Sequence, residues 1–159
     1  MPESEKEKPK IEDIASDYLD GEDLNNVLSF VSWLRKNRIT PSFGSKSKTG
    51  VSYTSSVCYV KLFHGYWYIW ISGKHRKHKN MFVNDFLVCK ELKEVVSENL
   101  PPCTVGCRHK CNQGKGYTVI VCGEKFENIC GCCTVRFLNP STKTLNIIKR
   151  VIERRNRIK

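Results

Sequence analysis

Hydrophobic positions recur at helical spacing in three long segments of the chain. Over 23–38 they recur every three or four residues, with Asp23 placed as the N-cap. A similar pattern covers 84–99, and a final helix is predicted to begin with Ser141 as its N-cap. A weaker amphipathic pattern predicts a short helix within 11–23. The core face of the final helix is expected to consist of Leu145, Ile148, Val151 and Ile152.

Segments rich in β-branched and aromatic residues predict strands instead. His64 and Gly65 separate the first two of these segments and are typical of a tight hairpin turn. The segment 41–54 is rich in Ser, Gly, Lys and Thr and is expected to be a loop, and 123–129 is expected to be a turn. The predicted strands lie at 56–63, 66–72, 117–122 and 132–138.

The second predicted strand carries apolar side chains on both of its faces. Successive strand residues point to opposite sides of a sheet, so odd and even positions form two separate rows. Since both rows are apolar, we expect a central strand that helices or loops cover on each side. The two rows are Trp67, Ile69 and Ile71 on one side and Tyr66, Tyr68 and Trp70 on the other.

The element order is helix, two strands, helix, two strands, helix, with short connections between neighbouring strands. This order favours a two-layer α+β fold, in which a mainly antiparallel sheet of about four to five strands packs against two to three helices. The 159 residues suit one ordinary domain. We expect that domain at 24–159, preceded by an acidic, partly disordered N-terminal tail at 1–23.

Charge is distributed unevenly along this chain of net charge +11. Residues 1–23 hold nine acidic residues and three lysines, which leaves 24 basic and seven acidic residues in the remainder. A body this basic attracts polyanions at long range, and the acidic tail either competes with such partners or simply aids solubility. No apolar run approaches the roughly 18–20 residues that span a bilayer, and the polar N-terminal segment predicts no secretory signal peptide.

A basic loop comes directly after the aromatic strand. Basic groups beside aromatic rings are typical of surfaces that bind nucleic-acid phosphates and stack bases, or of pockets for anionic small molecules. The alternative is that the aromatic residues belong to the core and the loop is merely solvated. The predicted ligand-binding residues are Lys74, His75, Arg76, Lys77, His78 and Lys79 of the loop, with Trp67 and Trp70 of the strand.

The nine cysteines divide into two groups. Cys58, Cys89 and Cys122 lie within predicted elements, where a free cysteine behaves as a small apolar residue. The other six lie between Cys103 and Cys133, and thiolates from two chain segments are what a tetrahedral zinc site needs. The predicted zinc ligands are Cys103, Cys107 and Cys111 with Cys130 or Cys132.

Other roles for this cysteine group remain open. The thiols could be unligated, or they could hold an iron–sulfur cluster. A reactive thiol is a third alternative, for which Cys107 and Cys111 are the best candidates because Arg108, His109 and Lys110 would lower their pKa. No phosphate-binding loop, dinucleotide fingerprint, metalloprotease helix or nucleophile elbow is present. An enzymatic role is therefore not indicated, although a thiol-dependent enzyme stays an alternative.

Three features of the chain occur together: the aromatic run 66–69 after a hairpin, the segment 119–126 with Cys130 after it, and 137–140 at the start of the last helix. With these features the chain resembles small uncharacterised bacterial α+β domains of the YdhG-like kind. The resemblance covers about 24–155 and implies a compact two-layer α+β fold with a small-ligand or partner-binding role. It implies no catalytic residues.

Taken together, these features predict a cytoplasmic, non-enzymatic module that binds a polyanion or an anionic small molecule and has no membrane partner. The first alternative is a module stabilised by zinc at the 103–133 cysteine group. The second is a thiol-dependent enzyme.

Overall fold

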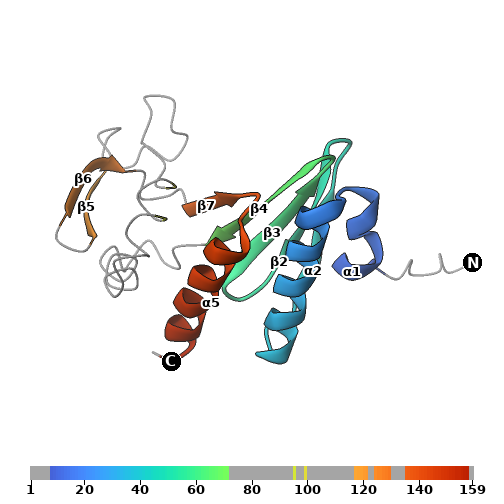
Figure 1. Ribbon diagram of the computed structural model, residues 1–159, viewed down its shortest axis with the longest axis horizontal. Coiled ribbons are helices and arrows are strands. Elements are labelled where there is room, and N and C mark those ends of the chain that lie inside the picture. The colour runs from blue at the N-terminus through green and yellow to red at the C-terminus, as the bar shows by residue number, and fades with distance from the viewer. Residues whose placement is uncertain are drawn as a thin grey trace, which may run out of the picture. The chain divides into compact units, whose positions relative to one another are not determined.

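The computed structural model describes residues 8–71, 95, 99, 117–121, 124–129 and 135–157 (Figure 1). The chain divides between Ile69 and Trp70 into two compact units. Its described helices and strands form the predicted α+β fold, with a five-stranded sheet of order β1-β2-β3-β4-β7 and a separate β5-β6 pair. The predicted domain boundary at residue 24 stays a prediction.

The N-terminal segment of the first unit is helical and attached to the rest of that unit. Helix α1 spans Ile11–Ile14 and a 3-10 turn, η1, spans Ala15–Asp17. Ile11 and Ala15 are fully buried. The Arg35 guanidinium donates to both carboxylate oxygens of Glu12, and it holds the pKa of that carboxyl below its usual value. The short helix predicted within 11–23 is therefore confirmed, and it is anchored by an ion pair and by burial.

Helix α2 spans Gly21–Lys36 and confirms the first predicted helix. Its buried residues Val27, Phe30, Val31 and Leu34 have the expected spacing of three and four residues. It begins earlier than predicted, because Asp20 and not Asp23 occupies the N-cap position. The Asp23 carboxylate accepts a hydrogen bond from the indole N–H of Trp67 at 3.3 Å, so this side chain joins the helix to the sheet.

Four consecutive antiparallel strands come after α2: β1 (Ser42–Lys46), β2 (Gly50–Thr54), β3 (Cys58–Phe63) and β4 (Tyr66–Ile71). The predicted hairpin of β3 and β4 is confirmed, with Gly65 at φ +82° in its turn. The predicted loop at 41–54 is wrong, since this segment is a hairpin of β1 and β2. Most of its residues are typical of turns, and only Phe43, Val51 and Tyr53 are apolar residues that point toward the core. The strands form because β1 pairs with β2 and β2 pairs with β3 through main-chain hydrogen bonds.

The register of β2 and β3 aligns one row of apolar side chains on the core face of the sheet. Val51 is paired with Leu62 and Tyr53 with Val60, and all four are buried. Trp67 and Ile69 extend the row along β4. Helix α2 lies against this face (Figure 1). The hydroxyl group of Tyr53 donates to the carbonyl of Pro9 at 3.0 Å, which ties the N-terminal segment to the same face.

The second unit contains β5 (Tyr117–Val121), β6 (Glu124–Ile129), β7 (Val135–Leu138) and helix α5 (Thr142–Arg157). The predicted strands at 117–122 and 132–138 are confirmed in their described parts. The predicted turn at 123–129 is wrong, because this segment forms β6, which pairs with β5. Main-chain pairing requires no particular residue types, so the composition of the segment did not reveal a strand. Within the predicted helix at 84–99, Val95 and Asn99 are helical and the rest lies outside the described residues.

The start of α5 agrees with the sequence in detail. The Ser141 hydroxyl oxygen accepts a hydrogen bond from the Thr144 backbone N–H at 3.2 Å, which is the geometry of a helix N-cap. The four residues expected on its core face are all buried: Leu145, Ile148, Val151 and Ile152. Both the cap and the apolar face of the final helix are confirmed.

Replacement of Gly50 by Ala is expected to destabilise the first unit strongly. A Cβ atom at this position would lie 2.3 Å from the Leu62 carbonyl oxygen and 2.9 Å from a ring carbon of Phe63, so β2 and β3 would have to separate. The expected loss is about 2 kcal/mol in the free energy of unfolding, measured by urea denaturation. Gly44→Ala is the matched control in β1, because its closest contact is the Ser52 side chain at 3.1 Å. Equal losses in both variants would contradict this packing.

The Glu12–Arg35 ion pair is expected to make stability depend on pH in the acidic range. The pKa of Glu12 is lower in the folded chain than its ordinary value of 4.5, so the unfolded chain binds the proton more readily. The ion pair therefore contributes fully to the free energy of unfolding above about pH 4.5, and this contribution is lost as the pH falls through the pKa of Glu12 in the folded chain. Glu12→Gln should remove this pH dependence at a cost of at most about 1 kcal/mol at pH 7. The free energy of unfolding should be measured between pH 3 and 7 for the natural chain and for Glu12→Gln. The same pH dependence in both proteins would refute the effect.

Candidate functional site

The side of the first unit's sheet opposite the core presents a row of aromatic and basic side chains. The same register that buries Val60 and Leu62 turns Tyr59 and Lys61 to the other side, opposite Thr54 and Ser52. In β4 the alternation turns Tyr66 and Tyr68 the same way. We call this surface the outer face, and it consists of Ser52, Thr54, Tyr59, Lys61, Phe63, Tyr66 and Tyr68.

Phe63 is the centre of an aromatic cluster on the outer face. A two-residue turn sets Phe63 opposite Tyr66, and their rings stack with centroids 4.5 Å apart and planes within 7°. The Tyr68 ring is tilted by 37° at 5.7 Å from Phe63. The Lys61 ammonium lies 5.1 Å from the centroid of the same ring. Phe63 therefore orients two tyrosines and one cation at once.

Aromatic side chains of the outer face are open to solvent. Tyr59 is 38% exposed and Tyr66 is 41% exposed, while Lys61, Phe63 and Tyr68 are half-buried. Large aromatic rings are usually buried, because their burial stabilises the fold. A row of exposed rings is therefore typical of a binding surface. Their phenol groups also provide hydrogen-bond donors beside the ring surfaces.

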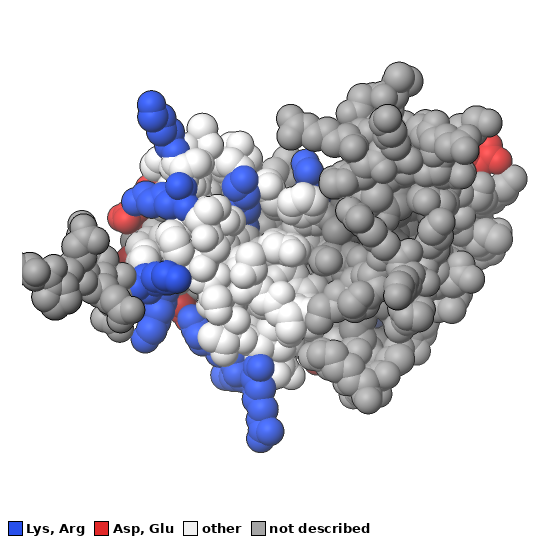
Figure 2. All heavy atoms as spheres, turned by 180° about the vertical axis from the view of Figure 1, so that it is seen from behind, with Lys and Arg blue, Asp and Glu red and all other residues white. Residues whose placement is uncertain are grey.

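The outer face is free of carboxylates. The segment 24–84 contains ten Lys or Arg residues and no Asp or Glu. Lys48, in the turn between β1 and β2, adds positive charge beside these strands, whereas Lys46 is paired with Val51 and points to the core side of the sheet. Seen from behind (Figure 2), the described surface is mostly uncharged, with several Lys and Arg side chains and few acidic ones. Positive charge of this kind attracts anions, and the described strands that form the face carry no carboxylate of their own.

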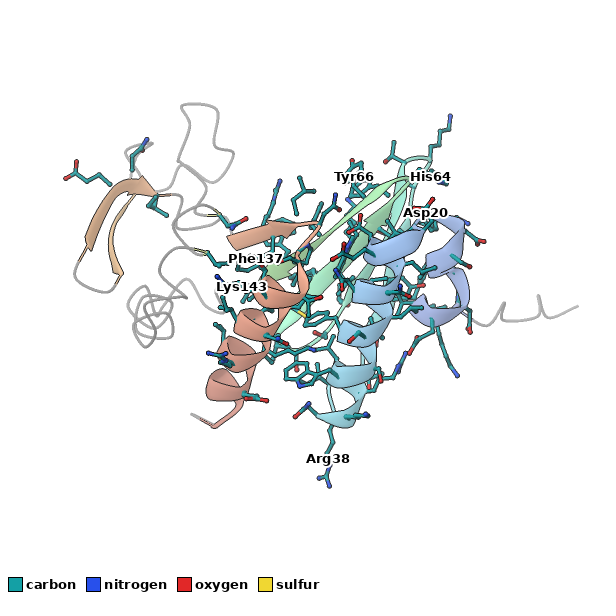
Figure 3. The ribbon with its side chains drawn as sticks, in the orientation of Figure 1. Asp20, Arg38, His64, Tyr66, Phe137 and Lys143 are labelled. Carbon is teal, nitrogen blue, oxygen red and sulfur yellow. The ribbon has the colours of Figure 1, made fainter. Side chains whose placement is uncertain are left out.

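The end of the hairpin that carries Phe63 and Tyr66 is fixed by contacts with Tyr18, the residue that follows η1. The His64 ring stacks on the Tyr18 ring with centroids 4.8 Å apart, and the Gly65 N–H donates to the Tyr18 carbonyl at 2.9 Å. Figure 3 shows His64 and Tyr66 at this end of the sheet and Asp20 at the start of α2. The turn is therefore held from outside the sheet, and the aromatic pair beside it is supported.

Hydroxyl groups extend the outer face across the β1–β2 hairpin. The Ser45 and Ser52 hydroxyl oxygens are 2.8 Å apart, and the Ser45 N–H donates to the Ser52 hydroxyl at 3.1 Å. These serines lie in the neighbouring strands of a sheet whose register shifts at a bulge between Phe43 and Ser45. The face therefore passes from aromatic rings on β3 and β4 to small polar groups on β1 and β2.

The two tryptophans predicted to bind a ligand lie in different surroundings. Trp67 is 0% exposed and is a core side chain, bonded to Asp23 on the α2 side of the sheet. A ligand on the outer face would meet Tyr66 and Tyr68 rather than Trp67. Trp70, in the second unit, is half-buried, and the Arg136 guanidinium carbon lies 4.7 Å from its ring centroid. This pair also joins an aromatic ring to a cation.

The remaining predicted site residues lie outside the described residues. They are the basic loop Lys74, His75, Arg76, Lys77, His78 and Lys79, and the cysteines Cys103, Cys107, Cys111, Cys130 and Cys132. Within the part of the chain that the structure describes, no group of three His, Cys, Asp or Glu side chains is placed to hold a metal ion. The zinc site therefore stays a prediction.

Sequence reasoning missed Tyr59, Lys61 and Phe63 as members of a surface. The available signal was the alternation of apolar and other residues along 58–63, which separates these three from Cys58, Val60 and Leu62. The basic loop and the tryptophans gave a stronger signal, which favoured β4 and the segment 74–79 instead. The large ring of Trp67 was predicted to bind a ligand, but it is buried in the core.

Comparison with protein families, with curated proteins and with solved structures finds no match. The resemblance to YdhG-like domains therefore stays a prediction.

Cys58 is expected to be inert toward alkylation in the folded protein. Burial raises the pKa of its thiol to about 11, and the side chain is 1% exposed. The burial of its side chain confirms the prediction that Cys58 acts as an apolar core residue. Peptide mapping after treatment with iodoacetamide at pH 8 should find Cys58 unmodified in the native chain and fully modified in about 8 M urea. Rapid modification of Cys58 without denaturant would show that this part of the core is open.

Proposed function

We propose that this protein is a non-enzymatic module that binds an anionic partner on the outer face of its sheet. The observation that carries the proposal is the exposed aromatic cluster around Phe63, with a lysine ammonium beside it and no carboxylate on the strands that form it. Ring surface and positive charge together suit a partner that has both negative charge and flat or apolar parts.

Long-range attraction to an anion is a consequence of the charge distribution. All acidic residues within 8–71 lie between Glu12 and Asp23, in α1, η1 and the first turn of α2. The outer face carries Lys61, and Lys48 lies in the β1–β2 turn, next to the end of β2 that is paired with Phe63. These cations attract a polyanion, and physiological salt screens the attraction over about 8 Å.

The chemistry of the outer face favours binding over catalysis. Phenol rings, a phenyl ring, hydroxyl groups and an ammonium group supply contact surface, hydrogen-bond donors and charge. Nucleophilic catalysis would need a nucleophile and a base within hydrogen-bond reach of each other.

We also propose a cytoplasmic location, in which the nine cysteines remain thiols. No helix among the described residues is long and apolar enough to cross a membrane.

Binding to a polyanion is expected to weaken steeply with salt and to depend on Lys61. Heparin and a single-stranded oligonucleotide, each labelled with a fluorophore, serve as probes for anisotropy titrations between about 50 and 200 mM salt. Lys61→Met keeps the apolar stem of the side chain against Phe63 and removes the charge. It should reduce the slope of log K against log salt by about 1 and weaken binding several-fold.

Lys143→Met is the matched control, because Lys143 is an exposed lysine in the first turn of α5. It should change the affinity much less than Lys61→Met does. A flat salt response with both probes would refute the proposed function. Equal effects of the two lysine substitutions would refute the assignment of binding to the outer face.

A further inference from the structure

We infer that the anionic partner is a single-stranded nucleic acid, whose bases stack on the tyrosines of the outer face. The inference rests on the proposed function and specifies its partner. Three features of the outer face support it: the spacing of its rings, the way Tyr66 is presented, and the position of its cations.

The spacing of the rings favours a single strand over a duplex. Tyr66 and Tyr68 are two residues apart on one strand, a separation of roughly 6.5–7 Å along the sheet. Stacked bases in a duplex advance by only about 3.4 Å, and neighbouring bases cover their ring faces. Bases that occupy successive tyrosines must therefore be unstacked, as they are in single strands bound on aromatic platforms.

Tyr66 is presented as a preorganised stacking surface. Phe63 covers one side of its ring at a centroid distance of 4.5 Å, and the side chain remains 41% exposed. The adjacent turn is held by the His64–Tyr18 stack and by the Gly65 hydrogen bond to Tyr18. Since the ring is already oriented, a base that stacks on it costs little side-chain ordering.

The cations are placed for a sugar–phosphate backbone that runs beside the rings. The Lys61 ammonium lies 5.1 Å from the Phe63 centroid, so charge and aromatic surface occur within one nucleotide's reach. Lys48, in the turn between β1 and β2, adds positive charge at the end of β2 where Gly50 is paired with Phe63. Ser45 and Ser52, on the same side of the sheet, add hydroxyl groups that can donate to phosphate oxygens.

The test compares three probes of equal length and equal label on the full chain. They are a single-stranded oligothymidine of about 12 nucleotides, a base-free deoxyribose-phosphate polymer and a DNA duplex. The oligothymidine should bind at least about tenfold more tightly than the base-free polymer, because only the former can stack. Vesicles containing phosphatidylserine serve as a fourth probe, since tyrosine and lysine surfaces also suit anionic lipid.

Two substitutions at Tyr66 separate stacking from charge. Tyr66→Leu keeps an apolar side chain and removes the flat ring, and it should weaken oligothymidine binding about tenfold while leaving the base-free polymer unaffected. Tyr66→Phe keeps the ring and should bind nearly as well as the natural chain. Tyr68→Leu tests the second position in the same way, and circular dichroism of each variant confirms that it is folded.

The outcomes distinguish the inference from the proposed function on which it rests. Equal affinity for the oligothymidine and the base-free polymer would overturn base stacking and leave polyanion binding intact. Tighter binding to the duplex or to the vesicles would overturn the choice of a single strand. Absence of binding to all four probes would overturn the proposed function itself.

Discussion

The structure of the first unit depends on the strict alternation of side chains along β3 and β4. Val60, Leu62, Trp67 and Ile69 are all buried against the helical layer, and the residues between them face the other way. A shift of pairing by one residue would exchange the two rows and expose the core. The burial of one row therefore dictates which aromatic residues reach the surface. The hydrogen bond from Trp67 to Asp23 adds a polar connection between sheet and helix.

The sheet also separates the charges of this unit. Its acidic residues occur in α1, η1 and the start of α2, and one of them is paired with Arg35. The strands carry lysines and no carboxylates. Helix α2 lies on the core side of the sheet (Figure 1), and the acidic residues of this unit occur in the helical segments and not in its strands. The separation of charge along the chain thus leaves the strands of this unit without acidic residues.

The edge strand β1 differs from the outer face in composition and in regularity. It is rich in Ser, Gly and Lys, and it contains a bulge between Phe43 and Ser45. Polar composition, charge and a bulge discourage edge-to-edge pairing with other chains. Aromatic surface is therefore concentrated on β3 and β4, where neighbouring strands satisfy the main chain. Binding through side chains, and not through strand addition, is what this arrangement favours.

Local patterns in the sequence determined much of the fold. The apolar spacing of α2, the His64–Gly65 turn and the Ser141 cap of α5 depend on neighbouring residues, and each is confirmed. The strands β1, β2 and β6 were missed, because main-chain pairing with the neighbouring strands stabilises them while their composition is typical of turns.

The candidate site depended still more on tertiary structure. The sequence showed that both rows of the strand β4 are apolar, so it left open which row faces the solvent. Packing against α2 decided this by burying Trp67 and leaving Tyr66 exposed. The clustering of Lys61, Phe63 and Tyr66 required the pairing of β3 with β4. Sequence alone thus determined which side chains were available, and long-range packing decided which of them form a surface, because burial depends on contacts between residues far apart in the chain.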